Sequence, residues 1–148
     1  MILATTAALL LAASASAQES RLQIGDMAFD ALPAQELAQG RCGLFLWARG
    51  AQPVFVLFAS DAPAQARVRI DGRDHELRRT AFSGESSHGH FERQTFSNGR
   101  LTLEADLAFD ETRPIRDGAI IERGMLRIAA RDGAETVAPV GGMTACKS

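Results

Sequence analysis

The sequence predicts an all-β protein, a single-domain antiparallel meander of about eight strands that forms a small barrel or sandwich. One short N-terminal helix and one disulfide complete this prediction. Three dipeptides typical of tight hairpin turns lie between strand-like segments, namely Asp71-Gly72, Asn98-Gly99 and Asp132-Gly133. The only two cysteines, Cys42 and Cys146, bracket nearly all of this patterned sequence.

Residues 1–17 predict a secretory signal peptide. Their apolar run ends in Ala15-Ser16-Ala17, a small-x-small cleavage site directly before Gln18. The run is too short to cross a bilayer, and no later stretch approaches the roughly 20 apolar residues that a spanning helix needs. We therefore expect a periplasmic or secreted protein without a transmembrane segment. A retained N-terminal helix is the alternative.

Residues 18–40 predict a lead-in to the β-domain, which would occupy residues 41–148. Residues 18–30 are weakly patterned and suit a covering segment. The stretch from Leu32 to Gln39 predicts the short helix, because Pro33 falls in its first turn and Gly40 follows its end.

Two continuous apolar runs predict the first two strands of the β-domain, and alternation predicts a later one. The runs 42–48 and 54–59 fit strands buried on both sides, and alternating apolar residues from Leu101 to Phe109 fit a strand buried on one face. The rings of the two runs are expected in the core, an aromatic binding platform being the alternative; they are Phe45, Trp47, Phe55 and Phe58. The eight expected strands are 42–48, 53–60, 65–71, 73–82, 91–97, 100–109, 119–131 and 134–140.

Two-residue turns fix the register of each hairpin, so opposed residues can be predicted. Around Asp71-Gly72 the register pairs Arg69 with Asp74 and Arg67 with Glu76, two opposite charges on one face. The other face of this hairpin pairs Val68 with His75.

The same rule gives the register of the other two hairpins. Around Asn98-Gly99 it pairs Thr95 with Thr102 and Arg93 with Glu104. Around Asp132-Gly133 it pairs Ile128 with Val137 and places Pro139 opposite Leu126. Since proline has no N–H, the last strand is expected to be an edge strand or to end there.

In an oxidising compartment, two thiols most simply form one disulfide, so we expect a Cys42–Cys146 bond. The formal net charge of −2 is too close to neutral for an electrostatic nucleic-acid binder. No cofactor is indicated, and the sequence leaves the oligomeric state open.

The polar segment 83–90 offers a possible metal site at His88 and His90, with Glu85 and Glu92 close in sequence. Two imidazoles with a carboxylate can hold Zn²⁺ or Cu²⁺. The alternative is a solvated hairpin loop whose glycines and serines provide flexibility.

Three polar residues fall on the expected inner face and could line a small cavity: His75, Glu92 and Gln94. The alternative is that His75 is a core residue and that Glu92 lies in water at a frayed strand end.

Known catalytic motifs are missing from the sequence, and the charged segment 110–117 suits a solvated loop. We therefore expect a non-catalytic binding module for an envelope macromolecule or a small ligand, because binding usually resides in loops on a rigid scaffold. An inhibitor of a secreted hydrolase such as lysozyme is one alternative, and a metal-binding protein is another. A third is an enzyme whose site is dispersed over separate strands at the mouth of a barrel, near His75 and Glu92.

The chain resembles the small periplasmic inhibitors of C-type lysozyme in architecture. The resemblance covers Cys42 near the first strand, the Asp71-Gly72 hairpin, the Ser83-Gly84 loop and the C-terminal Cys146. It implies an antiparallel barrel with a terminal disulfide. That family's loop reads Ser-Gly-Ala-Arg-Tyr, whereas Glu85 follows Ser83-Gly84 here and the chain has no tyrosine. No functional residue is therefore carried over.

Overall fold

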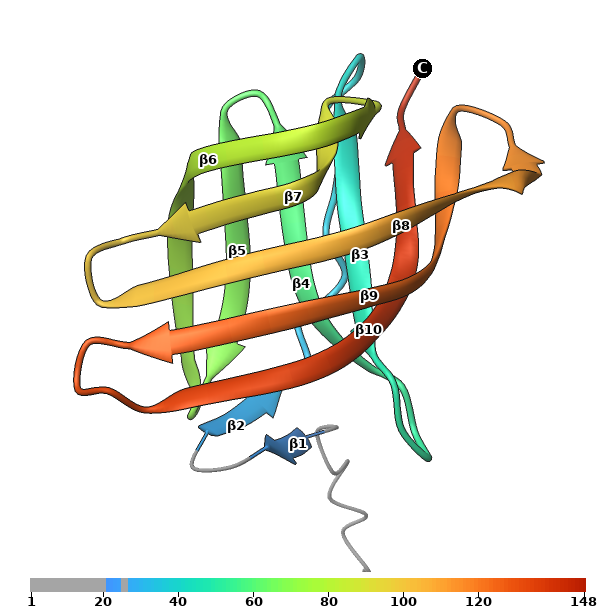
Figure 1. Cartoon of the computed structure of the whole chain (residues 1–148). Helices are drawn as coiled ribbons and strands as arrows, with labels where there is room; N and C mark the ends of the chain where they lie inside the picture. Colours follow the sequence, from blue (N-terminus) through green and yellow to red (C-terminus); the bar gives the residue numbers. More distant parts are fainter. Residues whose placement is uncertain (1–20, 25–26) are drawn as a thin grey trace, which may run out of the picture.

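The computed structural model describes residues 21–24 and 27–148, so the expected signal peptide lies outside the described residues. Figure 1 shows strands and connecting loops, and no helix occurs in the described part of the chain. The strands are β1 (Arg21–Ile24), β2 (Met27–Asp30), β3 (Cys42–Ala48), β4 (Val54–Asp61), β5 (Ala64–Ile70), β6 (Arg73–Ser87), β7 (His90–Ser97), β8 (Leu101–Ile115), β9 (Gly118–Ala130) and β10 (Glu135–Cys146).

Strands β3 to β10 form a closed antiparallel barrel in which each strand pairs with the next one along the chain. The first and last of them, β3 and β10, pair with each other and close the ring. Closure satisfies the hydrogen-bonding groups that two free sheet edges would expose. The predicted all-β meander is therefore confirmed, and its form is a barrel.

The disulfide lies in the seam that closes this barrel. Cys42 of β3 stands directly opposite Cys146 of β10, and their sulfur atoms are bonded at 1.98 Å. Beyond the bond the two ends of the barrel remain paired, because Gly40 N donates to Lys147 O and Lys147 N donates to Arg41 O. The predicted disulfide is confirmed.

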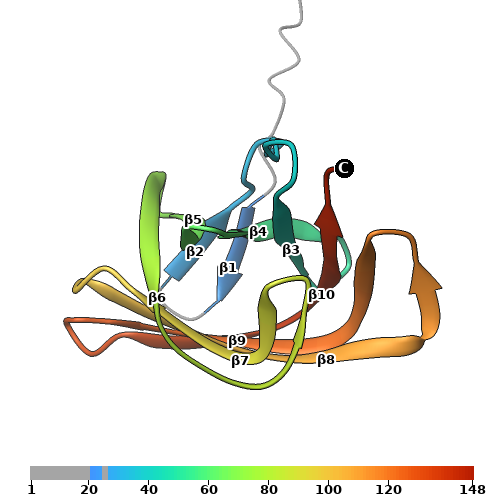
Figure 2. The same ribbon diagram turned by 90° about the horizontal axis from the view of Figure 1, so that it is seen from above.

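The β1–β2 hairpin lies at one end of the barrel, at the bottom of Figure 1 and within the ring of strands in Figure 2. Phe29 of β2 pairs with Ile70 of β5 and is fully buried. Two carboxylates fix the contact: Asp30 Oδ2 accepts from Gly72 N at 2.6 Å, and Asp71 Oδ1 accepts from Ala28 N at 3.1 Å. Part of the expected lead-in is thus a strand pair that covers this end of the barrel.

Aliphatic side chains from seven of the eight barrel strands fill the interior, and β7 contributes the aromatic ring of Phe96. An eight-stranded barrel is just wide enough for inward side chains to fill it. Burying such side chains is the main favourable term in folding. The largest fully buried aliphatic residues are Leu44, Leu46, Leu57, Leu77, Leu103, Ile121, Leu126 and Ile128.

The predicted helix from Leu32 to Gln39 is wrong, because this segment has no helical turn. It runs instead along the outer face of β3 and β4, where Leu32 N donates to Phe55 O at 2.8 Å and the Leu32 side chain is buried. An eight-residue helix is marginal by itself. The hydrogen bond and apolar contacts offered by the barrel therefore decide the conformation.

The register predicted for the β5–β6 hairpin is confirmed. Arg69 lies opposite Asp74 and Arg67 opposite Glu76, with ion pairs of 2.6 and 2.8 Å. Val68 faces His75. The turn residues and the charge pattern indicate the same pairing here, so the local sequence was sufficient to predict the register.

The register predicted for the β7–β8 hairpin is wrong by two residues: Thr95 faces Glu104 and Arg93 faces Asp106. The turn is centred one residue later than expected, because Asn98 Oδ1 accepts from the backbone N of Arg100 at 2.9 Å and of Leu101 at 2.8 Å. Such side-chain hydrogen bonds let Asn precede a turn instead of occupying its centre. The even shift leaves every side chain on its predicted face.

The register predicted for the β9–β10 hairpin is wrong by one residue, since Ile128 faces Thr136. The loop has three residues and ends at Gly133, whose φ of 94° suits glycine. A shift by one residue reverses the faces of a strand. Val137 is consequently 41% exposed, although the sequence had paired it with a core residue.

The last strand neither ends at Pro139 nor is an edge strand. β10 continues to Cys146 between β9 and β3. Pro139 lies just before the β3 ladder begins at Val140, and its carbonyl accepts from Arg49 N at 2.9 Å. The missing N–H therefore interrupts no β3–β10 pair.

Replacing both cysteines, Cys42→Ser with Cys146→Ser, is expected to lower the free energy of unfolding by about 4.7 kcal/mol, the chain-entropy value for a closed loop of roughly 100 residues. The two cysteines are 104 residues apart. Urea denaturation measures the loss, with Ala145→Ser as the control in the same seam. A loss below about 1 kcal/mol would show that strand pairing closes the barrel without help from the bond.

Candidate functional site

The two polar segments singled out in the sequence, 83–90 and 110–117, meet at the barrel end that holds the C-terminus (Figure 1). We call this the disulfide end. The distal hairpin, residues 110–122, joins β8 to β9. Its residues 118–121 pair with β10, and residues 110–115, expected as part of a loop, belong to β8. A hollow of about 620 Å³ lies between it and the β6–β7 hairpin. Its lining comprises Glu85, Ser86, Ser87, Glu92, Phe109, Asp110, Glu111, Thr112, Pro114, Gly118 and Ala119.

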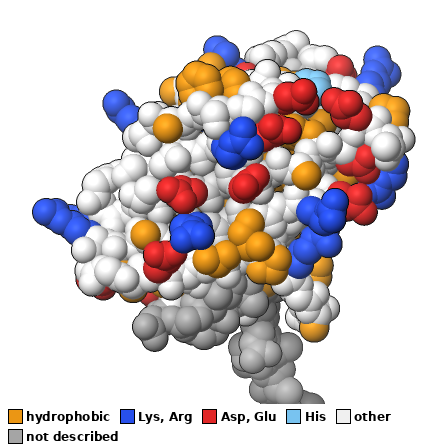
Figure 3. Space-filling model, viewed as in Figure 1, with side chains coloured by type: hydrophobic (Ala, Val, Ile, Leu, Met, Phe, Trp, Pro, Cys, Tyr) orange, Lys and Arg blue, Asp and Glu red, His pale blue; other side chains and the backbone are white. Residues whose placement is uncertain are grey.

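The hollow is acidic. Four carboxylates line it: Glu85, Glu92, Asp110 and Glu111. Acidic side chains also gather toward this end of the barrel on the face that Figure 3 shows. Hydrogen bonds from the Thr112 side chain, from Arg113 and from the Thr112 backbone lower the pKa of Asp110 to about 2. The nearby cation of Arg113 is already engaged, 2.8 Å from Asp110 and 3.6 Å from Glu122.

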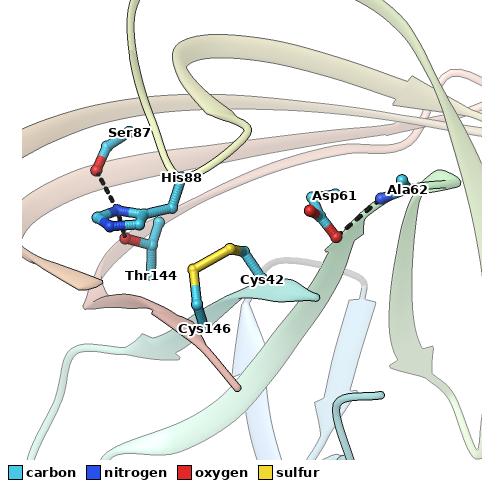
Figure 4. The surroundings of a disulfide bond; sticks show 7 residues. All are labelled: Cys42, Asp61, Ala62, Ser87, His88, Thr144 and Cys146. Carbon is cyan, nitrogen blue, oxygen red and sulfur yellow. Dashed lines mark hydrogen bonds between the residues drawn. A yellow bond between two sulfur atoms is a disulfide. The ribbon is translucent and has the colours of Figure 1, made fainter. Parts of the chain in front are cut away.

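The tip of the β6–β7 hairpin rests on the barrel beside the disulfide. Figure 4 shows His88 near Thr144 on one side of the bond and Asp61 on the other. His88 Nδ1 lies 2.9 Å from Ser87 Oγ and 3.5 Å from Thr144 Oγ1. Gly89 has a φ of 79°, and a Cβ there would lie 2.9 Å from Asp61 Cβ, so only glycine fits this approach.

His90 is the buried residue of this tip. It is fully buried, and neither ring nitrogen has a hydrogen-bond partner of ordinary geometry in the described part of the chain. Burial lowers its pKa to about 4, while the Cys42 carbonyl and the Asp61 charge favour the protonated form only in part. The imidazole is therefore neutral at ordinary pH.

The two histidines of the predicted metal site have different surroundings, since His88 is exposed and His90 is buried. Among residues 21–24 and 27–148, no three His, Cys, Asp or Glu side chains are grouped to hold a metal ion. The metal site stays a prediction that rests on this pair alone.

The three predicted cavity residues line different parts of the molecule. Gln94 is 2% exposed and points into the barrel, and Glu92 is half-buried and lines the acidic hollow. His75 is half-buried at the opposite end, in a hollow of about 500 Å³ that Met27 and Leu101 also line. The structure therefore does not bring His75 together with the other two.

The four rings of β3 and β4 lie on the outside of the barrel, so their predicted place in the core is wrong. Alternate residues of β3, such as Leu44 and Leu46, fill the interior and turn Phe45 and Trp47 outward. Trp47 stacks on Phe55 with ring centroids 5.0 Å apart. Both faces of these strands are apolar, so the sequence carried no polar residue to mark the outer face.

Sequence reasoning also missed Arg79 of β6. Its guanidinium lies 5.0 Å from the ring centroids of both Phe82 and Phe91 and donates to Gly89 O and Gln94 Oε1. No sequence motif marks an arginine whose partners come from the far side of a hairpin. The pairing of β6 with β7 brings Arg79 together with these two rings and two acceptors.

Comparison with models of known protein families, with curated proteins and with solved structures finds no match to this chain. In the described residues no helix is long and apolar enough to cross a membrane.

The buried His90 predicts a pH-dependent stability. Its folded pKa of about 4 is below the ordinary 6.5, so the unfolded chain binds the proton more readily. Stability is thus complete above pH 6.5 and falls as the pH drops from 6.5 to 4, by up to about 3 kcal/mol. Urea denaturation over this range measures the loss.

The matched variants are His90→Gln, which should remove this pH dependence, and His88→Gln, which should keep it because His88 is exposed. Equal pH slopes in wild type and His90→Gln would contradict the assignment.

Proposed function

We propose that this protein is a non-catalytic binding protein that acts in the periplasm or after secretion. Its binding region is the acidic hollow at the disulfide end. The observation that supports this most is that two polar hairpins, distant in sequence, line one hollow of about 620 Å³ on a closed barrel. Loops held by a rigid scaffold are where binding usually resides, and a disulfide is stable in an exported protein.

The geometry of the only Ser–His contact among the described residues supports a non-catalytic role. The described residues place Ser87 Oγ 2.9 Å from His88 Nδ1, but the two are sequence neighbours on an exposed tip. The other hydrogen-bond partner of this imidazole is Thr144, not a carboxylate that would orient a catalytic base.

The charge of the hollow indicates the chemistry of the ligand. Its carboxylates Glu85 and Glu111 are exposed and have no basic partner among the described ion pairs, whereas Asp110 is paired with Arg113. Phe109 and Pro114 add apolar surface. A ligand that carries amine groups on an apolar body, free or as part of an envelope macromolecule, complements this lining.

Spermine is a suitable probe for this chemistry. Glu85→Gln with Glu111→Gln is expected to weaken spermine binding at low salt by about tenfold, because two carboxylates facing the amine are lost. Isothermal titration calorimetry measures the affinity.

Glu36→Gln with Glu104→Gln is the control, since it removes the same charge from exposed positions outside the hollow. Equal weakening in both double variants would mean that only net charge matters, and the hollow would lose its assigned role.

A second candidate function is the inhibition of a secreted, basic hydrolase such as lysozyme. The tip of the distal hairpin projects beyond the barrel in Figures 1 and 2, as an element that enters an enzyme cleft would. It carries four carboxylates, Asp110, Glu111, Asp117 and Glu122, against two arginines, so its net charge is negative and complementary to a basic surface.

If this second function holds, added protein should reduce lysozyme activity at near-stoichiometric amounts in a cell-wall turbidity assay. Glu111→Arg should raise the inhibitory concentration about tenfold through like-charge repulsion, whereas Glu36→Arg should not. Full lysozyme activity at a large excess of the protein would eliminate this function.

A further inference from the structure

Arg79 is a half-buried cation without a counter-charge among the described residues. Its Nη1 donates to Gly89 O at 3.0 Å and to Gln94 Oε1 at 3.1 Å, and both acceptors are neutral. Burial disfavours its charged form and lowers its pKa. Buried or partly buried charges are normally paired, so this guanidinium lacks the negative group that would complete it.

Two aromatic rings orient the guanidinium. Its Cζ lies 5.0 Å from the centroid of the Phe82 ring and 5.0 Å from that of the Phe91 ring. Cation–π contacts of this kind hold the planar group in place. Phe82 is 58% exposed, so the cluster borders solvent on this side. A small solute can approach Arg79 there.

Further unpartnered polar atoms lie next to Arg79. Gln94 Nε2 and the two ring nitrogens of His90 have no hydrogen-bond partner of ordinary geometry in the described part of the chain, where the Cys42 carbonyl is the backbone group near the His90 ring. Both side chains are at least 98% buried. Buried polar side chains nearly always have partners. Arg79 already occupies Gln94 Oε1, so what the amide still offers is its N–H donors. His90 directly follows Gly89, the other residue that Arg79 contacts.

We propose that Arg79, Gln94 and His90 form a binding site for a small oxyanion, a carboxylate or a phosphate, at the disulfide end of the barrel. All three side chains have N–H donors to offer, and the guanidinium adds the positive charge that two anionic oxygens require. None of the three lines the acidic hollow. The site is thus separate from the proposed binding region and opposite to it in charge preference.

The test is a titration of the full chain with sodium acetate and, separately, with sodium phosphate at pH 7 and constant ionic strength. The side-chain NMR signals of Arg79 Nε–H and Gln94 Nε2–H₂ report binding at the site. A saturable shift with acetate identifies a carboxylate site, and one with phosphate alone identifies a phosphate site. The absence of a saturable shift with either anion would overturn the proposal.

Matched variants locate the anion. Arg79→Gln is expected to weaken binding at least about tenfold, because it removes the charge-assisted hydrogen bonds. Arg78→Gln, the exposed neighbour, should bind as wild type does. Gln94→Leu keeps Arg79 and should weaken binding as well, which covers the case in which Arg79→Gln does not fold. Wild-type affinity in Gln94→Leu and in any folded Arg79→Gln protein would overturn the proposal.

Discussion

The pairing of β3 with β10 is the contact on which the rest of the structure depends. It joins the first and last barrel strands across a separation of 104 residues between Cys42 and Cys146. Bringing such distant segments together costs loop-closure entropy, which the disulfide removes from the folding equilibrium by restricting the unfolded chain. Without this seam the sheet would have two open edges. The tip of the β6–β7 hairpin would also lose the support of Thr144 in β10.

Closure also explains how two opposite chemistries can occupy one end of the barrel. The β6–β7 hairpin contributes Glu85 and Glu92 to the acidic hollow, and it contributes Arg79 to the proposed oxyanion site. The tip of this hairpin rests on Asp61 and Thr144, which fixes its position on the barrel. The two proposed sites differ in the charge that they would select, and the seam supplies a rigid support for both.

Much of the fold was predictable, because hairpin chemistry is local. All eight barrel strands overlap the predicted ones, although β6, β8 and β10 continue past their predicted ends at residues 82, 109 and 140. The β5–β6 register is correct because Asp71-Gly72 and the charge pairs agree. The other two registers failed because loop length was assumed to be two residues. Asn98 accepts hydrogen bonds from the turn that follows it, and Gly133 ends a three-residue loop. A side-chain hydrogen bond or one extra residue is enough to shift a register.

The sequence by itself determined the strand order, the disulfide partners and the polar character of segments 83–90 and 110–117, since each depends on residue type and near neighbours. Only the tertiary structure decided that these segments share a hollow, that Trp47 faces outward and that Leu32–Gln39 is not a helix. Those outcomes depend on the curvature of the closed sheet. They also depend on which of the two apolar faces of β3 and β4 turns toward the barrel interior. Local patterns do not encode such long-range constraints.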